Sequence, residues 1–356
     1  MKKYLIVMVA ICCALPQLMA QQLLTAPRGS QYNSVTQRIG LTDITIEYSS
    51  PRVNDREIWG AVVPYGETPF PWRAGANENT VITLSADAQV EGKDLEAGSY
   101  GLHIVPAESG DWTLIFSNDY QAWGSFNYNK DNDALRVSVT PETLQEKREW
   151  LVFEFADKGP DYAVASLVWD QMRIPFRIEV DLHGQVLASY KAELMSLPGF
   201  SWQGPMQAAN YCLTNDVELE QGMAWADQAI NNQKNFNTMN TKAGLLAKMG
   251  KQAEADELMV EAVDLPSTTV GDLYGYGRQL IGQGKKDEAM AIFKKNAKRN
   301  PDHWLAPHGM ARAYSAKGDF KKALPLEREA LEKAPAGSKG FLEGFVAQLE
   351  KGEDFN

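Results

Sequence analysis

The residues best suited to do chemistry lie in one proline-rich segment, residues 50–80, which reads SPRVNDREIWGAVVPYGETPFPWRAGANENT. The segment contains four prolines, three arginines and two tryptophans, and it is longer than a hairpin turn. Guanidinium groups bind carboxylates and phosphates through paired hydrogen bonds, and aromatic rings stack on flat ligands. One hypothesis is that the segment is a recognition loop for a small anionic or glycan ligand. The candidate ligand-binding residues are Arg56, Tyr65, Trp72, Arg73, Asn77 and Glu78.

Two other hypotheses account for the same segment. In the first, it is an ordered loop that closes one end of a β domain, and Arg73 forms an ion pair with Glu78. In the second, the protein is a hydrolase in which Glu57 or Glu78 acts as the acid or base. Nothing else in the sequence identifies a reaction. Whether the protein is an enzyme therefore stays open, and we favour a non-enzymatic protein.

The histidines and acidic clusters do not predict a metal site. None of the four histidines belongs to an HExxH pair, and the spacing of His303 and His308 does not place them on one helical face. Asn129, Asp131 and Asp133 have the spacing of the first ligands of a calcium loop, but the glycine that such a loop requires is absent. We interpret this stretch as a turn, and we expect neither a metal ion nor a cofactor.

The tryptophans raise the question of sugar binding, because six of the nine lie in the first half of the chain. Trp112, Trp150 and Trp169 lie within or beside apolar strand runs, where packing in a core explains them. Trp72 and Trp123 lie in loop-like sequence instead. These two are therefore the tryptophans that we expect to be available to a ligand.

The charge of the chain argues against a nucleic-acid partner. The sequence has 35 basic and 46 acidic residues, and its formal net charge is −11. Residues 21–190 carry 13 basic and 24 acidic side chains, whereas residues 191–356 carry 20 and 22. A surface that binds a polyanion needs clustered Lys and Arg side chains, and the first half has the opposite balance.

Residues 1–20 have the pattern of a signal peptide. Two lysines precede an apolar stretch, residues 4–15, which is shorter than the roughly 20 residues that cross a bilayer. We expect cleavage after Ala20. No later segment is long and apolar enough to span a membrane, so the sequence predicts a periplasmic or secreted protein. A membrane anchor is the alternative.

The cysteines bear on the same question. Cys12 and Cys13 lie inside the predicted signal, which leaves lipid attachment as a further alternative, although Ile11 is larger than the residue that normally precedes a lipidated cysteine. Cleavage leaves Cys212 as the only cysteine, so we expect no intramolecular disulfide. Ordinary hydrophobic cores must then hold the protein together.

Residues 24–182 predict an antiparallel β-sandwich or barrel. Short runs rich in β-branched and aromatic residues are separated by turn residues, without intervening helices. The runs are Ile44–Tyr48, Thr80–Ser85, Gly98–Val105, Trp112–Ser117, Ala134–Val139, Trp150–Ala156, Tyr162–Trp169 and Arg173–Val180, and Ala88–Val90 leads through a tight turn to Leu95. His103 alternates with Leu102 and Ile104, so we expect it on the strand face opposite the core.

Several blocks in this half follow one another in a specific order: SPRVNDREIWG, VPYG, WRAGANENT, LEAGSYGLHIVP, WGSFNY and DALRVSV. In this order they resemble an uncharacterised family of exported bacterial domains, domain of unknown function 2911, over roughly residues 24–180. The resemblance implies a place in the cell envelope of Gram-negative bacteria and implies no mechanism. The link between the PYG and WR blocks, residues 67–71, is longer than the family pattern, so this loop tip is expected to differ.

The second half repeats with a period of 34 residues. Gly250, Gly284 and Gly318 have this spacing, and so do the small residues Ala209, Ala243, Gly277 and Ala311. This is the spacing of tetratricopeptide (TPR-like) repeats, in which glycine occupies the turn between two helices and small residues let helices approach closely. We expect a linker over residues 183–202, then a TPR-like array over residues 203–351 that ends in a capping helix.

The predicted architecture is therefore an α+β chain of two domains. Cys212 falls on an inward position of the array, where we expect a buried, unreactive thiol. Resemblance to TPR proteins implies a concave surface for a protein or peptide partner, and a non-enzymatic interaction protein is our first hypothesis. The alternatives are small-ligand binding by the 50–80 loop, and an array that merely packs on the β domain.

Overall fold

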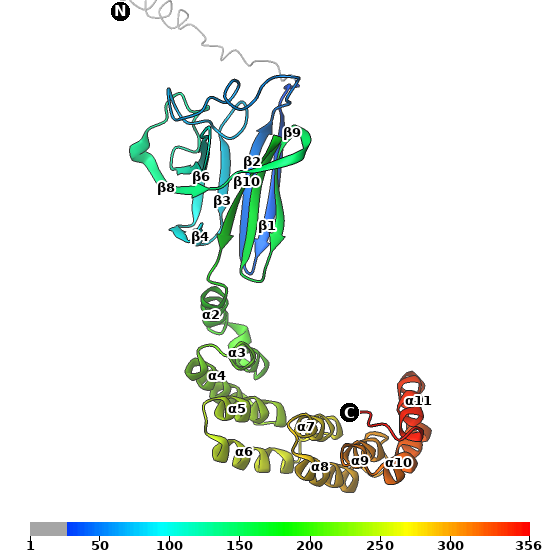
Figure 1. Cartoon of the computed structure of the whole chain (residues 1–356). Coiled ribbons are helices and arrows are strands. Elements are labelled where there is room, and N and C mark those ends of the chain that lie inside the picture. The colour runs from blue at the N-terminus through cyan, green and yellow to red at the C-terminus, as the bar shows by residue number, and fades with distance from the viewer. Residues whose placement is uncertain (1–26) are drawn as a thin grey trace, which may run out of the picture. The chain divides into compact units, whose positions relative to one another are not determined.

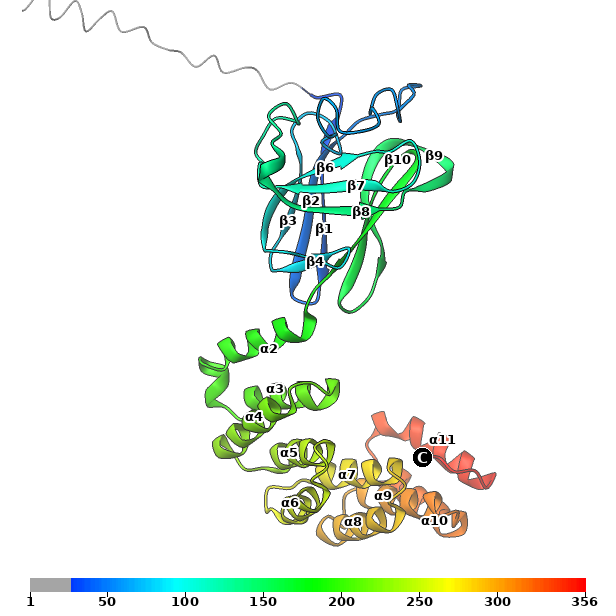
Figure 2. The ribbon, with the colours of Figure 1, turned by 60° about the vertical axis from the view of Figure 1, so that its left-hand side comes forward.

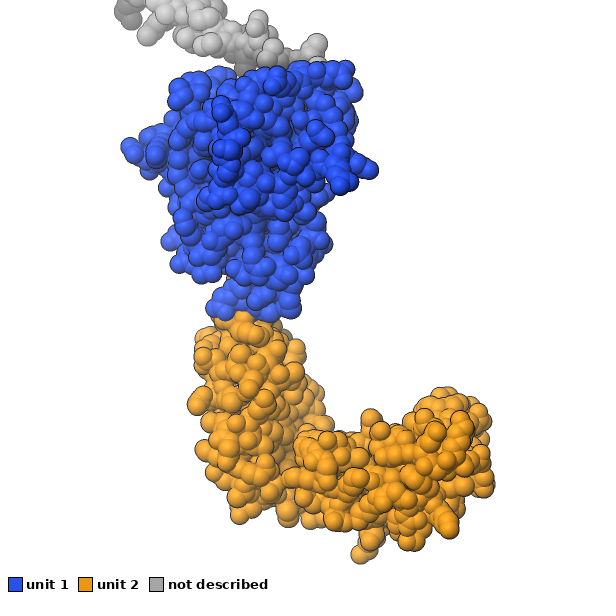
Figure 3. Space-filling model, viewed as in Figure 1, with its two compact units in different colours: residues 1–182 blue, residues 183–356 orange. Residues whose placement is uncertain are grey.

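The structure is a computed structural model that describes residues 27–356, so the predicted signal peptide lies outside the described residues. The chain divides into two compact units, residues 1–182 and residues 183–356 (Figure 3). Each unit has hydrophobic clusters of its own. Among the described residues, no helix is both long enough and apolar enough to cross a bilayer.

Unit 1 is built from two antiparallel sheets (Figure 1). Within the described residues the first sheet has six strands, in the order β1 (Gln31–Ile39), β2 (Thr42–Ser50), β3 (Thr80–Leu84), β6 (Gly98–Val105), β7 (Trp112–Ser117) and β8 (Asp133–Val139). The second sheet of that part has four, in the order β5 (Lys93–Leu95), β4 (Ala88–Val90), β10 (Tyr162–Glu179) and β9 (Glu142–Lys158). Because β1 and β8 are free edges of the first sheet, the sheets do not form a closed barrel, and that alternative is wrong.

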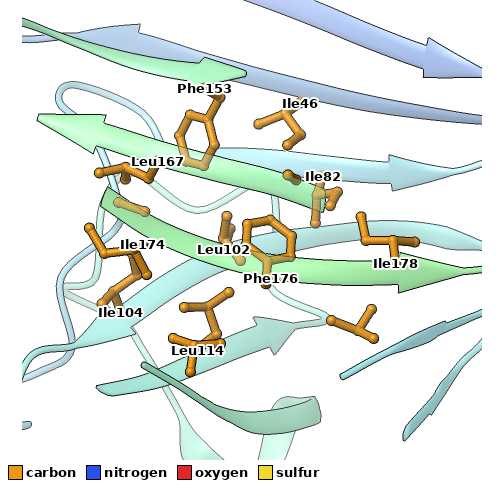
Figure 4. Packing of buried hydrophobic residues seen from close by; sticks show 14 of the residues in the cluster. Ile46, Ile82, Leu102, Ile104, Leu114, Phe153, Leu167, Ile174, Phe176 and Ile178 are labelled. Atoms are coloured by element: carbon orange, nitrogen blue, oxygen red, sulfur yellow. The ribbon is translucent and has the colours of Figure 1, made fainter. Parts of the chain in front are cut away.

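One buried cluster holds the two sheets together. Along β2 every second residue from Thr42 to Tyr48 is buried, because a strand turns alternate side chains to opposite faces. Ile46 of β2 and Ile82 of β3 belong to the same cluster as Phe176 of β10 (Figure 4). Full burial of each such side chain contributes roughly 1.5–3 kcal/mol. The alternating runs in the sequence therefore supply the core of this unit.

Two strands differ from the predicted ones. The runs 162–169 and 173–180 form one strand, β10, because an irregularity at Asp170, where φ is 53°, absorbs the residues between them. The sequence signal misses β1, because QYNSVTQRI has little apolar character and the strand lies at a sheet edge. The tight turn between β4 and β5 forms as predicted, with Glu91 and Gly92 both at positive φ.

The segment 183–202 is largely helical, whereas we expected a linker. It contains most of α2 (Leu182–Glu193) and the short 3₁₀ helix η2 (Leu197–Phe200). Leu187 of α2 is buried in a cluster with Ala208 and Cys212 of the next helix. The helix is stable here because a neighbouring helix covers its apolar side chains. The position of Cys212 confirms the buried thiol.

The other helices of unit 2 form consecutive pairs. The pairs are α3 (Gln203–Asn215) with α4 (Leu219–Asn232), α5 (Phe236–Lys248) with α6 (Gln252–Asp264), α7 (Val270–Gly282) with α8 (Lys286–Arg299), and α9 (Leu305–Ala316) with α10 (Phe320–Lys333), and α11 (Ala336–Glu350) follows. Gly250, Gly284 and Gly318 lie between the helices of a pair, with φ of 79°, 76° and 79°. Glycine adopts this left-handed conformation without strain, so the repeat spacing is explained.

The small residues of the repeat lie where helices meet. Ala209 and Ala311 are fully buried, and Ala243 is nearly so. At Gly277 of α7, an added Cβ atom would lie 2.4 Å from the ring of Phe293 in α8. Any larger side chain would therefore push α7 and α8 apart. These contacts confirm the second series of the 34-residue period.

The helix pairs of unit 2 form a curved stack (Figures 1 and 2). Helix α3 contacts α5, and α7 contacts α9, so the first helices of successive pairs lie side by side. They line the inner side of the curve, and the second helices lie on its outer side (Figure 1). We call the surface formed by α3, α5, α7 and α9 the inner face.

Candidate functional site

The 50–80 loop follows a defined path because main-chain hydrogen bonds attach it to strands. Trp72 exchanges two such bonds with Ile104 of β6, with N–O distances of 2.9 and 2.7 Å. Near the start of the loop, the amide of Val53 donates to the carbonyl of Glu149 in β9 at 2.8 Å. These attachments fix the directions of the candidate side chains. The loop is thus an ordered part of unit 1.

Trp72 packs inside the unit. Its ring stacks on Trp169, with centroids 5.8 Å apart and an interplanar angle of 19°. It also meets Trp59 edge-on at 5.8 Å, and its Nε1 atom donates to the carbonyl of Gly75 at 3.2 Å. Trp169 covers one face of the ring, so packing within the unit accounts for this side chain. The ligand-binding role of Trp72 stays a prediction.

Arg56 and Tyr65 lie on the surface of the loop. The guanidinium of Arg56 donates to the main-chain carbonyls of Val53 at 3.0 Å and Arg52 at 2.5 Å, so it stabilises its own turn. Tyr65 is partly exposed and lies against Gly60. These contacts are local, and they are sufficient to explain both side chains without a ligand.

Asn77 and Glu78 bind residues at the start of the described chain. Asn77 donates from Nδ2 to the carbonyl of Ser30 at 3.2 Å, and Glu78 accepts from Arg28 at 2.5 Å. The expected pair of Arg73 with Glu78 is therefore wrong. The hydrogen bond from Arg28 holds the pKa of Glu78 below its ordinary value. A carboxyl group kept ionised in this way is unsuited to act as a general acid.

Arg73 differs from Arg56 because no described residue accepts a hydrogen bond from its buried Nε atom. Its side chain is half-buried, and no carboxylate among the described residues forms an ion pair with it. Burial lowers the pKa of this guanidinium. Arg73 therefore keeps binding capacity that the described part of the protein does not use.

Three other predictions for unit 1 concern the exposure of single side chains. Trp150, which we expected in the core, is about one-third exposed, and the guanidinium of Arg52 lies 5.3 Å from its ring centre. Trp123 is exposed, as its loop-like sequence indicated. His103 is buried even though it lies between two core positions of β6, because the loop that follows β7 covers that face. Its Nδ1 atom lies 3.0 Å from Oγ of Ser125 in this loop.

The inner face of unit 2 holds a non-helical segment of the chain itself, residues 353–356, which follow α11 and run back to α9 (Figures 1 and 2). Ser315 of α9 donates to Asp354 at 2.6 Å. The amide side chain of Asn356 accepts from Nη1 of Arg312 and donates to the carbonyl of the same residue, both at 3.2 Å. We call these four residues the docked segment.

Phe355 anchors the docked segment in an aromatic slot. Its ring lies 4.8 Å from that of Phe345 in α11 and 6.0 Å from the imidazole of His308 in α9. The guanidinium of Arg312 lies 5.0 Å from the same ring, within the range of a cation–π contact. Only 6% of Phe355 is exposed. The slot therefore binds an aromatic side chain from an irregular stretch of backbone.

A buried histidine–glutamate pair supports the slot from behind. His308 and Glu327 of α10 are both buried, and Nδ1 of the histidine lies 2.8 and 2.9 Å from the carboxylate oxygens. Arg312 is also buried and donates from Nε to the hydroxyl of Tyr274 in α7 at 2.8 Å. This network connects three helices and fixes the side chains that touch the docked segment.

The surface beside the slot repeats part of its chemistry. Arg278 of α7 lies one 34-residue period before Arg312 and is exposed. Its guanidinium lies 5.9 Å from the ring centre of Tyr274, which Arg312 also contacts. Two arginines of successive first helices therefore flank one tyrosine on the inner face. One of them binds the docked segment, and the other faces solvent.

The sequence contained two signals for this site that our predictions did not use. Gly352 lies 34 residues after Gly318 and has φ of 77°, so α11 is followed by the same left-handed turn as the earlier first helices. The four residues after that glycine include one aromatic residue between two polar ones. A further helix in the repeat spacing, followed by a glycine turn and an aromatic residue, was therefore open to prediction, whereas the His308–Glu327 contact was not.

The fold is that of a two-unit chain, an antiparallel β unit followed by a TPR-like array. Residues 30–178 match the model of the family described as "Protein of unknown function (DUF2911)", which confirms the resemblance of the sequence blocks. Among curated proteins, none matches this chain.

Solved structures similar to the chain include that of YrrB, described as a TPR protein with an unusual peptide-binding site. The identity is 20%, the TM-score is 0.31, and the match covers 46% of this chain and 83% of that one. Another is a human IFIT1 dimer with PPP-AAAA, at 16% identity and a TM-score of 0.31, which covers 48% of this chain and 42% of that one. The repeat character of the array is defined by its own helix pairs, glycine turns and buried small residues.

Proposed function

We propose that the protein is a non-enzymatic interaction module that binds a peptide or a segment of a partner protein on the inner face of its array. The observation that carries the proposal is the docked segment, because an irregular stretch of chain already lies on this face. Ser315 and Arg312 hold it through side-chain hydrogen bonds, and an aromatic slot buries Phe355. The same kinds of contact recognise peptides in trans.

The chemistry of the neighbouring surface indicates which segments fit. A partner would place an aromatic side chain in the slot and a carboxamide or carboxylate next to Arg312. If it continued toward α7, a second acidic side chain would meet the exposed Arg278. We therefore expect a partner segment with an aromatic residue flanked by Asp, Glu or Asn.

The proposal can be tested with a labelled peptide that copies residues 351–356, KGEDFN. In the full-length chain the docked segment competes with the probe at an effective concentration on the order of millimolar. Phe355→Ala weakens this competitor without changing the slot. We expect the probe to bind the Phe355→Ala protein at least about tenfold more tightly than the unchanged protein, measured by fluorescence anisotropy.

Two controls keep the test decisive. A probe with alanine in place of its phenylalanine should bind neither protein, and Ser315→Ala in the Phe355→Ala background should weaken binding of the original probe. Circular dichroism would verify that each variant keeps its helices. If the Phe355→Ala protein keeps its helices and binds no probe at millimolar concentration, the inner face is not a peptide site and the proposal is wrong.

We also propose that the protein acts outside the cytoplasm, in the periplasm or as a secreted protein. The support is the lysine-led apolar stretch in residues 1–20 and the exported family that the first half resembles. The mass of the protein recovered from expressing cells tests this directly. A mature chain beginning at Gln21 is the expected result, and an intact or lipid-modified N-terminus would contradict it.

The alternative function, binding of a small ligand by the 50–80 loop, keeps only part of its support. A glycan ligand would need exposed aromatic rings in the loop, and Trp169 covers one face of the Trp72 ring. An anionic ligand would need an available guanidinium group, and Arg73 meets that condition among the described residues.

A further inference from the structure

We propose that unit 1 contains a binding site for a small organic anion, in which Arg73 binds a carboxylate or phosphate group and exposed aromatic side chains cover the apolar body of the ligand. The site is independent of the inner face of the array. It is formed where the 50–80 loop meets the loop that follows β7, residues 118–130.

The first argument is that the guanidinium of Arg73 is half-buried and has no partner among the described residues. A half-buried guanidinium is normally bound by carboxylates or carbonyls, because removing an unpaired charge from water is unfavourable. Arg136 of β8 in the same unit shows the usual arrangement. It donates to Glu67, to Asp133 at 2.6 Å and to the hydroxyl of Tyr128 at 2.6 Å. Arg73 has no such partner among the described residues, so its natural complement is an external anion.

The second argument is the set of polar groups near Arg73. His103 is 2% exposed, and its pKa is lowered to about 4 by burial and by the charge of Arg73, so the imidazole is neutral at pH 7. Asn79 is 6% exposed, and its buried Oδ1 atom has no hydrogen-bond partner within residues 27–356. An unsatisfied buried amide oxygen needs a donor such as a hydroxyl group or a water molecule. The ligand or its bound water can supply that donor.

The third argument is close packing around Gly124 and Gly101. A Cβ atom at Gly124 would lie 3.4 Å from Cδ of Arg73 and 3.6 Å from the ring of Phe126. A Cβ atom at Gly101 would lie 3.2 Å from Nδ2 of Asn79 and 3.3 Å from Nε2 of His103. The two glycines therefore let the polar groups and the aromatic loop approach one another.

The fourth argument is the aromatic surface beside Arg73. Phe126 is 69% exposed and Trp123 is 54% exposed, and the ring of Phe126 meets that of Phe70 edge-on at 5.4 Å. A cluster of large exposed aromatic side chains indicates a binding site, whereas scattered exposed ones do not. The Gly124 position brings Phe126 close to the side chain of Arg73, whereas the ring of Trp123 lies 5.8 Å from the guanidinium of Arg28. Phe126 is therefore the ring that combines with Arg73, and such a combination recognises a ring or apolar group bearing an acid.

The nearest carboxylate does not already neutralise the site. Asp119 lies close enough to His103 to affect its pKa, but its Oδ2 atom accepts a hydrogen bond from Asn132 at 2.7 Å. It forms no ion pair with Arg73 in the described chain. Residues 21–190 have an acidic excess, so anions are not attracted by the unit as a whole. Recognition must come from Arg73 and its immediate surroundings.

Binding of phenyl phosphate, benzoate and the neutral analogue benzyl alcohol to the full chain tests the proposal, with tryptophan fluorescence and thermal stability as readouts. We expect both anions to bind and the neutral analogue not to bind. Arg73→Met should weaken binding of the anions at least about tenfold, as loss of a charged hydrogen-bonding partner does. The tighter of the two anions distinguishes a phosphate ligand from a carboxylate ligand.

Arg56→Met is the matched control, because it removes an arginine of the same loop that binds only carbonyls of its own turn. It should bind both anions like the unchanged protein. Arg73→Lys keeps the charge without the paired geometry and should give an intermediate affinity. The proposal is overturned if neither anion binds at about 10 mM, or if Arg73→Met binds them as tightly as Arg56→Met does.

Discussion

The two units use a buried arginine in opposite ways. In the array, Arg312 is surrounded by partners: the hydroxyl of Tyr274, the side chain of Asn356 and the ring of Phe355. In the β unit, Arg73 is half-buried, and none of the residues that the structure describes accepts a hydrogen bond from its Nε atom. The chain fills the first site with its own residues and leaves the second without a complement. An external ligand must therefore compete with the docked segment for Arg312. At Arg73, a ligand would instead supply the anionic partner that the half-buried guanidinium lacks among the described residues.

The comparison also separates two ways of building a site. The array positions its side chains by repetition, so Arg278 and Arg312 occupy matching positions of successive first helices. The β unit positions Arg73 by irregular loops, which are fixed by single contacts such as the exchange between Trp72 and Ile104. Substitutions in the array should therefore act on the stability of the helical stack, and substitutions near Arg73 should act mainly on binding.

The largest expected loss of stability comes from breaking the buried contact between His308 and Glu327, which supports the inner face. His308→Leu leaves the carboxylate of Glu327 buried without its partner, because both side chains are inaccessible to solvent. Breaking a buried pair in this way costs about 3–5 kcal/mol of unfolding free energy. Urea denaturation followed by circular dichroism measures the loss. The double variant His308→Leu/Glu327→Leu should recover much of it, and a single-variant loss below about 1 kcal/mol would contradict the role of the pair.

The next largest expected effect is a loss of stability of unit 1 at low pH, caused by protonation of His103 near Arg73. The folded-state pKa of His103 is about 4, below its ordinary value of 6.5, because burial and Arg73 oppose protonation. As pH falls from 6.5 to 4, the unfolded chain therefore binds the proton first, and unit 1 loses stability across this window. The shift corresponds to about 3 kcal/mol in total.

Denaturation of the unchanged protein and of His103→Gln at pH 7 and pH 4 measures this contribution. Tryptophan fluorescence reports mainly on unit 1, because six of the nine tryptophans lie in the first half of the chain. We expect the stability of the variant to fall by about 3 kcal/mol less than that of the unchanged protein. Equal losses in both proteins would mean that the imidazole is not held neutral.

A smaller effect distinguishes two glycines of the same helix. Gly277→Ala places a methyl group 2.4 Å from the ring of Phe293, so it should destabilise the array by about 1–3 kcal/mol. Gly275→Ala is the matched control, because a Cβ atom there meets nothing within 4 Å. Alanine favours helix over glycine by about 1 kcal/mol, so the control should be neutral or stabilising. Equal melting temperatures for the two variants would refute the packing argument.

The sequence predicted the regular parts of the molecule because their signals repeat. Each glycine of the 34-residue period marks a turn, and each alternating run between residues 24 and 182 marks a strand. The edge strand β1 was not predicted because apolar and polar residues do not alternate along it. Helix α2 was not predicted because it lies outside the repeat spacing and is stabilised by its contacts with α3. Both depend on neighbours that a single segment cannot reveal.

The candidate sites were predicted less well, for a related reason. The sequence placed Arg73 in an unusual loop but paired it with Glu78, which binds Arg28 instead. It also offered Trp72 as a stacking ring, although the bridge to β6 directs that side chain inward. The side chains that surround Arg73, including His103 and Phe126, come from other segments. Contacts between loops depend on tertiary structure, and residue type alone does not determine them.

The smallest expected effect on stability is also the most informative about the two arginines. Arg136→Met leaves Glu67 without its ion-pair partner and removes one of the donors to Asp133, which keeps the hydroxyl of Tyr128. The change should cost about 1–3 kcal/mol in urea denaturation followed by fluorescence. Arg73→Met removes a charge that has no ion-pair partner in the described part of the chain, and it should change the stability by less than about 1 kcal/mol, in either direction. A structural arginine would behave like Arg136, so a loss of similar size at position 73 would contradict the comparison. A neutral or stabilising result would mean that the fold tolerates Arg73 without needing it, which is the behaviour of a residue that is retained to bind something else.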